Sequence, residues 1–158
     1  MFHSSTVVER LLQDLKHQES TVREAATQTL WRLWFEQKGA IGLQLLQRSQ
    51  ELLNAGELQE AERALTHVIQ SMPDFAEAWN RRAVLYFMQR QYLLALDDCH
   101  QVVRLNKAHF GAWHGLGLCH AALGQYQEAI QAFRQALLLQ PHSLENQRQI
   151  LECTACLN

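Results

Sequence analysis

A repeat of 34 residues runs through the sequence between about Gly42 and Ser143. Two sets of residues recur at this period: Ala61, Ala95 and Ala129, and also Leu45, Trp79 and Trp113. A unit of this length is typical of two short amphipathic helices, which cannot bury their apolar faces alone and have to stack on further copies. Stacked units form an extended concave surface, so the repeat predicts a protein that binds rather than one with a catalytic pocket.

The composition and charge narrow the class of protein. Of 158 residues, 47% are hydrophobic, 19% are charged and only two are proline, which is the balance of an ordered, soluble helical protein. The net charge of -2 lacks the excess of Lys and Arg that a nucleic-acid partner requires. No run approaches the ~18 apolar residues of a membrane span, and residues 1–5 lack the pattern of a secretory signal. We therefore expect no nucleic acid, no membrane insertion and a cytoplasmic location.

The third repeat carries the most regular set of residues, which is Trp113, Leu116, Gly117, Tyr126, Ala129, Phe133, Ala136 and Pro141. In order and spacing these residues resemble the consensus of the tetratricopeptide repeat family. The second repeat departs from that consensus at Arg82, Arg90 and Lys107, and the first has Leu45 where the others have Trp. The resemblance implies an all-α fold, in which about nine helices form a right-handed α-α superhelix.

This register predicts three hairpins, at residues 42–75, 76–109 and 110–143, followed by a capping helix at 144–158. The expected helices of the hairpins are 42–55 and 58–71, 76–89 and 92–105, and 110–123 and 126–139. Gly56 and Gly124 end first helices because glycine tolerates positive φ. Small residues such as Ala83 and Gly117 let the two helices of a hairpin approach closely.

Residues 1–41 do not follow the period and predict a further helical hairpin that packs on the superhelix. Its second helix is expected to begin at a capping box from Thr21 to Glu24 and to end at Gly39. The segment has a short resemblance to one HEAT repeat, but an ordinary hairpin stacked on the first repeat is the simpler interpretation. Trp31, Trp34 and Phe35 spread around more than one face of this helix. Either the hairpin is sandwiched, for example by reaching into the concave face, or these three form a partner or dimer surface.

The first helix of each repeat lines the concave groove in this family, and helical spacing selects the residues that face it. They are Leu46, Gln50, Glu77, Asn80, Arg81, Val84, Phe87, Met88, His114, Leu118 and Ala121. The candidate partner-binding site comprises Asn80, Arg81, Val84, Phe87, Met88, His114 and Leu118. We expect apolar side chains of a peptide or helix to pack there while Arg81 and Asn80 hold a carboxylate or a backbone carbonyl. The alternative is a solvated groove without a ligand.

Some members of the family hold the C-terminal carboxylate of heat-shock chaperones through Lys, Asn, Asn, Lys and Arg at five groove positions. The matching residues of this chain are Leu46, Gln50, Arg81, Gly111 and Gly115. Four of these five lack the required charge or amide geometry, so a chaperone-tail clamp is disfavoured.

Other chemistry finds little support. Cys153 and Cys156 form a CxxC motif, but neither a second ligand pair nor a βαβ context accompanies it, so we expect no metal and no cofactor. No nucleophile elbow or phosphate loop is present, which predicts no enzymatic activity.

The Trp-Arg-Leu-Trp-Phe segment before three repeats is similar to small repeat proteins of photosynthetic bacteria and plastids. The sequence thus predicts a non-enzymatic adaptor for a protein or peptide partner, with a role in assembly or regulation of a larger complex. The alternative is a homo-oligomer, such as a homodimer, that uses the groove or the Trp31, Trp34 and Phe35 surface.

Overall fold

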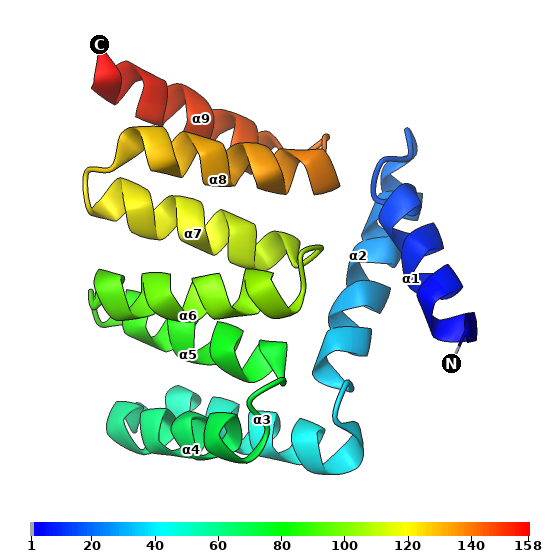
Figure 1. The fold of residues 1–158 in the computed structure, drawn as a ribbon, viewed down its shortest axis with the longest axis vertical. Helices are drawn as coiled ribbons and strands as arrows, with labels where there is room; N and C mark the ends of the chain where they lie inside the picture. Colours follow the sequence, from blue (N-terminus) through cyan, green and yellow to red (C-terminus); the bar gives the residue numbers. More distant parts are fainter. Residues whose placement is uncertain (1) are drawn as a thin grey trace.

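The computed structural model describes residues 2–158, with side chains from residue 5 onward, and in this part of the chain it contains nine α-helices and no strand. Seven of the helices stack in chain order, and two stand beside the stack (Figure 1). Their bounds are α1 Phe2–Asp14, α2 Ser20–Phe35, α3 Gly39–Asn54, α4 Leu58–Ser71, α5 Ala76–Met88, α6 Tyr92–Leu105, α7 Phe110–Ala122, α8 Tyr126–Leu139 and α9 Leu144–Leu157. The all-α superhelical fold expected from the period is therefore confirmed.

The helix bounds follow the 34-residue register closely. The second helices of the three hairpins, α4, α6 and α8, span the expected residues, and α5 and α7 end one residue early. The exception is α3, which begins at Gly39 instead of residue 42. Gly39 itself has a φ of 66°, so it turns the chain between α2 and α3 rather than ending a helix that runs to residue 38.

The close contact between the helices of a hairpin depends on small residues at fixed positions. Ala61, Ala95 and Ala129 lie one period apart, and all three are fully buried. In the third hairpin, a Cβ on Gly117 would come within 2.4 Å of the Phe133 ring, so only glycine fits there. Within a hairpin, a large side chain on one helix thus faces a small residue on the other.

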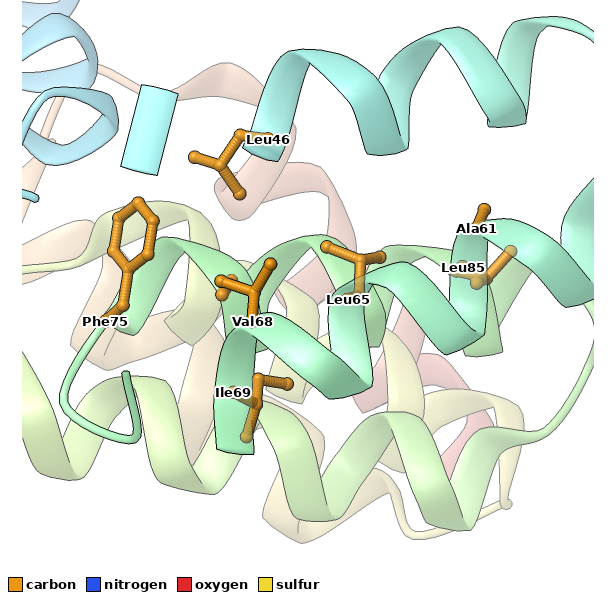
Figure 2. Close-up of a cluster of buried hydrophobic side chains, with 8 residues drawn as sticks. Leu46, Ala61, Leu65, Val68, Ile69, Phe75 and Leu85 are labelled. Atoms are coloured by element: carbon orange, nitrogen blue, oxygen red, sulfur yellow. The ribbon is translucent and has the colours of Figure 1, made fainter. Parts of the chain in front are cut away.

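The first hairpin and the start of the second share one apolar core (Figure 2). Leu65, Val68 and Ile69 of α4 lie in this core together with Phe75, which precedes α5. Leu46 of α3 belongs to this core and is buried, so its assignment to the groove was wrong. It packs inward because α3 has no earlier repeat to cover it, and its apolar side chain leaves water by joining this core.

The turns inside the three hairpins have the same geometry but different residues. Gly56 and Gly124 adopt φ of 77° and 74° there, as expected. Arg90 occupies the matching position of the second hairpin with a φ of 60°. A side chain at positive φ costs roughly 1 kcal/mol relative to glycine, so the second hairpin carries local backbone strain.

One hydrogen bond recurs with the period and links each first helix to the loop before it. The indole of Trp79 donates to the carbonyl of Pro73, and that of Trp113 donates to the carbonyl of Lys107, both at 2.9 Å. One period later, Gln147 donates to the carbonyl of Pro141 at 3.2 Å. Helix α9 therefore follows the repeat pattern and packs against α8 as the first helix of an incomplete repeat.

The N-terminal hairpin does not stack on the first repeat, and that expectation was wrong. Helix α2 runs alongside the stack, across the ends of the repeat helices (Figure 1). Leu15 and Leu30 share an apolar cluster with Phe110 of α7, and Gln140 after α8 donates to Thr27 at 3.4 Å. The physical reason lies in the large aromatic side chains of α2, which find apolar cover at the start of α7.

The start of α2 also differs from the expected capping box. The helix begins at Ser20, one residue before Thr21, and its first turn has no side-chain cap. Arg23 instead donates to the carbonyls of His17 and Gln18, which holds the preceding turn in place.

Among residues 2–158, no helix combines the length and the apolar character that a membrane crossing requires.

Candidate binding groove

A cavity of about 210 Å³ lies between α5 and α7. Of the seven candidate site residues, the structure brings six together around it: Asn80, Val84, Phe87, Met88, His114 and Leu118. Ala83, Cys99, Gly111, Gly115 and Cys119 complete the lining. Spacing along α5 and α7 thus selected side chains that share one space.

The apolar wall of the cavity is open to a ligand. Val84 and Met88 lie one turn apart on α5, and 48% and 62% of their surfaces are exposed. Phe87 is partly buried and packs edge-on against Tyr92, with ring centroids 5.3 Å apart. Since exposed apolar side chains gain by leaving water, this wall favours an apolar group of a partner.

The floor of the cavity depends on Gly111 and Gly115 of α7, which the sequence placed in the groove only as positions that lack the clamp side chains. A Cβ on Gly115 would lie 3.2 Å from the sulfur of Cys99 on α6, so the missing side chain opens the cavity down to that thiol. A Cβ on Gly111 would lie 2.7 Å from the ring of Trp31. Two glycines four residues apart on the inner face of a first helix are a signal that could have predicted this depression.

Cys99 and Cys119 lie side by side at this floor and are hydrogen-bonded to each other. The hydrogen bond, followed by burial, raises the pKa of Cys99. The same hydrogen bond lowers the pKa of Cys119. Both sulfurs present a soft, largely apolar surface at the floor of the cavity.

A buried polar network supports the end of the cavity that Asn80 forms. Asn80 donates from Nδ2 to Oε1 of Glu77 at 3.1 Å. The other oxygen of Glu77 lies 3.0 Å from Nε2 of His109, and both side chains are fully buried. Nδ1 of His109 accepts the backbone N–H of Ala112, which caps the start of α7. Nε2 of His109 must therefore carry the proton and donate to the Glu77 carboxylate.

Glu77 was expected to face the groove, and this expectation was wrong. Its carboxylate is directed into the protein because His109, at the start of α7, supplies a buried donor. A buried carboxylate requires such partners, since an unpaired one would lose its hydration without compensation.

Arg81 does not join the other six candidate residues at the cavity. Its guanidinium lies 4.6 Å from the centre of the Phe35 ring, donates to Gln50 at 2.6 Å and has its Nε 3.5 Å from Glu77. The cation is thus already engaged by an aromatic ring, an amide and a carboxylate. The guanidinium is directed to these partners and does not line the cavity, so the binding of a ligand carboxylate by Arg81 stays a prediction.

His114 forms a second polar point on the wall. Its Nδ1 lies 2.8 Å from Oδ1 of Asn146 on α9. The amide nitrogen of Asn146 donates to the hydroxyl of Ser143, so its oxygen is the acceptor for His114. The capping helix therefore fixes the orientation of a groove residue.

The positions of the chaperone-tail clamp are occupied by other contacts. Leu46 is in the core, Gln50 accepts from Arg81, and Gly111 lies beneath the ring of Trp31.

Trp31, Trp34 and Phe35 make their contacts within the chain. Trp34 stacks on the ring of His109 with centroids 4.5 Å apart, and Trp31 packs edge-on against Phe110 at 5.5 Å. Phe35 lies under Arg81. Of the two alternatives for this cluster, the structure has the sandwiched hairpin, which leaves all three rings partly buried.

The cysteines of the CxxC motif point in different directions. Cys153 is buried against α8, where burial raises the pKa of its thiol, while Cys156 is exposed. Among residues 2–158 no group of three His, Cys, Asp or Glu side chains is arranged to hold a metal ion.

Comparisons with known proteins agree with this architecture. Two family models, both described as tetratricopeptide repeat, match residues 46–105 and residues 111–143. A TPR repeat-containing protein of Rhizobium etli is 26% identical over 144 residues, which cover 90% of this chain and 71% of that protein. Human tetratricopeptide repeat protein 13 is 36% identical over 91 residues, which cover 58% of this chain but only 10% of that protein.

Solved structures with the same fold include domains that bind peptides. The first TPR of Spaghetti (RPAP3), bound to an HSP90 peptide, has a TM-score of 0.70 and 24% identity, and the match covers 73% of this chain and 91% of that chain. The crystal structure of MamA has a TM-score of 0.67 and 22% identity, with 70% of this chain and 65% of that chain covered. At these identities the likeness shows the fold alone.

Proposed function

The chain belongs to the tetratricopeptide repeat family, and from this premise we propose that it is a non-enzymatic adaptor whose concave groove binds a peptide or helix of a partner protein. The observation that carries the proposal is the open apolar cavity between α5 and α7. Exposed Val84 and Met88 on its wall have no cover within the described part of the chain. An apolar groove of this shape suits a partner segment that inserts one or more side chains.

The peptide-bound relatives support a protein partner in general terms. The domain of Spaghetti (RPAP3) holds an HSP90 peptide, and a second domain of human RPAP3 holds an HSP70 peptide. For this chain the partner, an assembly or regulatory role, and a cytoplasmic site of action remain proposals. The uneven spacing of the four cysteines favours a reducing compartment for that role.

The proposal is tested by a pair of matched double variants in a crosslinking pull-down from the native cell. Val84→Glu with Met88→Glu places two charges on the groove wall, at exposed positions where folding tolerates them. Leu93→Glu with Leu138→Glu places the same charges at positions that are both 65% exposed and outside the cavity. We expect a partner that the wild type and the Leu93/Leu138 variant retain, and that the groove variant loses by at least about tenfold, the change that 1.4 kcal/mol of binding energy produces.

Circular dichroism of both variants must show wild-type helix content for this comparison to stand. Retention of every partner by the groove variant would move the binding site to another face of the molecule. Loss of the partner from both variants would show that general surface charge, not the groove, controls retention.

Self-association is the second candidate function, and one observation favours it. Leu144 and Leu151 lie seven residues apart on one face of α9, both are strongly exposed, and nothing in the described chain covers them. The rings of Trp31, Trp34 and Phe35 are engaged within the chain, so a dimer would use α9 or the groove. Light scattering across concentration tests this: a dimer at low micromolar protein that Leu151→Glu dissociates supports it, and a monomer throughout contradicts it.

A further inference from the structure

The polar side chains on the wall of the groove are Asn80 and His114, and the hydrogen bonds behind them determine what they can offer to a ligand. Asn80 donates from Nδ2 to Glu77. Glu77 is an acceptor on both oxygens, because Nε2 of His109 donates to the other one. The amide nitrogen of Asn80 is therefore held on the side of Glu77, and its Oδ1 has no partner among the described residues and remains free to accept.

His114 offers the same chemistry. Its Nδ1 donates to Oδ1 of Asn146, so Nε2 of the neutral imidazole carries a lone pair. Both polar side chains that line the cavity thus retain an acceptor atom without a partner among the described residues. A ligand that pairs with these two acceptors therefore has to supply an N–H or O–H donor.

The charges around the cavity disfavour an anion. The carboxylate of Glu77 lies directly behind Asn80. The nearby cation, Arg81, is engaged by Glu77, Gln50 and Phe35 and does not line the cavity. A ligand carboxylate would lose its hydration here without gaining a free cation or a free donor.

A cationic ligand group is also poorly matched, because no carboxylate lines the cavity. A neutral donor carries no charge, so it avoids both the desolvation cost of an anion and that of a cation. Beside it, the apolar space of about 210 Å³ has room for one side chain of leucine size, since a dry cavity of about 150 Å³ already holds benzene.

From these contacts we propose that the groove, in its proposed role as a binding site, takes an internal segment of a partner that inserts one apolar side chain and donates a neutral N–H to Asn80 and His114. A free C-terminal carboxylate is rejected. The orientation of the Asn80 amide, set by buried Glu77, makes this selection.

Two small probes that differ in one group test the proposal directly on the full chain. N-acetyl-leucinamide carries the leucine side chain beside a neutral amide donor, and N-acetyl-leucine carries the same side chain beside a carboxylate. Each is titrated into labelled protein at about pH 8 while amide resonances are followed by NMR. We expect the signals of Gly111, Gly115 and Leu118 to shift with the amide at concentrations at least about tenfold lower than with the carboxylate.

Substitution of the acceptors separates recognition from simple apolar binding. Asn80→Leu removes the amide oxygen at similar size, and His114→Phe removes the imidazole acceptor. Either should reduce the preference for the amide probe several-fold while the apolar contact keeps some binding of both probes. A change at Arg104, which is exposed and outside this cavity, is the control and should leave the preference unchanged.

Equal binding of the two probes, preference for the carboxylate, or no shift at the cavity with either probe would overturn the proposed ligand class. These outcomes are distinct from failure of the proposed function. If the amide probe is preferred but the Val84→Glu/Met88→Glu variant retains all partners, the chemistry of the cavity stands and the groove's role as the partner site fails.

Discussion

The indole of Trp34 stacks on the imidazole of His109, with ring centroids 4.5 Å apart and ring planes inclined by 18°. This contact joins α2, outside the repeats, to the residue that caps α7 and donates to buried Glu77. The N-terminal hairpin is thereby connected to the polar network that orients Asn80 in the groove.

Trp34→Ala should detach this contact and lower the free energy of unfolding by about 2–3 kcal/mol, because a partly buried tryptophan loses several ring contacts. Urea unfolding measures the loss, and hydrogen exchange should accelerate in residues 20–35. Arg32→Ala, on the exposed face of the same helix, is the control and should change stability little. Unaltered exchange in Trp34→Ala would mean that other contacts hold the hairpin.

Gly117→Ala should destabilise the third hairpin by about 1–3 kcal/mol despite the better helix propensity of alanine. The new Cβ would lie within 2.6 Å of three atoms of the Phe133 ring, which is fully buried and cannot move away. Thermal unfolding measures the effect. Phe133→Leu in the same chain, which copies Leu65 of the first hairpin, should recover part of the stability lost to overpacking; no recovery would contradict this explanation.

Arg90→Gly should raise the free energy of unfolding by roughly 1 kcal/mol, because glycine adopts positive φ without a steric cost. Chemical denaturation of the variant beside the wild type provides the test. Gly124→Ala, at the matching turn of the third hairpin, should have the opposite sign and a similar size. A loss of stability in Arg90→Gly would instead show that the arginine side chain contributes more than its backbone costs.

Arg82→Leu should destabilise the protein by about 3 kcal/mol, since it leaves buried Asp98 without its paired cation. One period later the same two positions hold Leu116 and Ala132. The double variant Arg82→Leu with Asp98→Ala should therefore recover most of the loss. Double-mutant analysis by urea unfolding checks this, and additive losses would refute a dependence of the two residues on each other.

The protein should lose stability as the pH rises from about 10 to about 12. Burial, followed by the hydrogen bond to Glu62, raises the pKa of Tyr86 to about 12. In the unfolded chain tyrosine ionises near pH 10, so over this interval the folded state binds more protons and the free energy of unfolding falls with pH. Tyr86→Phe removes this ionisation, and its unfolding free energy should fall less steeply over the same interval.

The period predicted most of the fold because each repeat contacts its neighbours in a standard way. The bounds of α4, α6 and α8 and the burial of Ala61, Ala95 and Ala129 follow directly from the 34-residue register. The N-terminal hairpin lies outside that register, so local pattern could identify its helices but not their direction. Its position depends on the meeting of Trp34 with His109, a contact between distant parts of the sequence.

The residues of the candidate site could likewise be predicted only in part from the sequence. Helical spacing selected Val84, Met88 and Leu118 because side chains one turn apart share a face. It could not assign Arg81, whose guanidinium has partners on α2, α3 and α5. The direction of a long polar side chain depends on three-dimensional neighbours, and these are not encoded in the period of its own helix.

A repeat stack without other supports behaves as a spring, because each unit touches only the next one. Helix α2 changes this mechanical character. Its 16 residues extend about 24 Å and contact the side of the stack from α5 to the end of α8. Because α2 contacts the stack near both of its own ends, it should hold the curvature of the stack constant. The width of the groove should then not change when a ligand enters. The chain should also unfold as one unit instead of repeat by repeat.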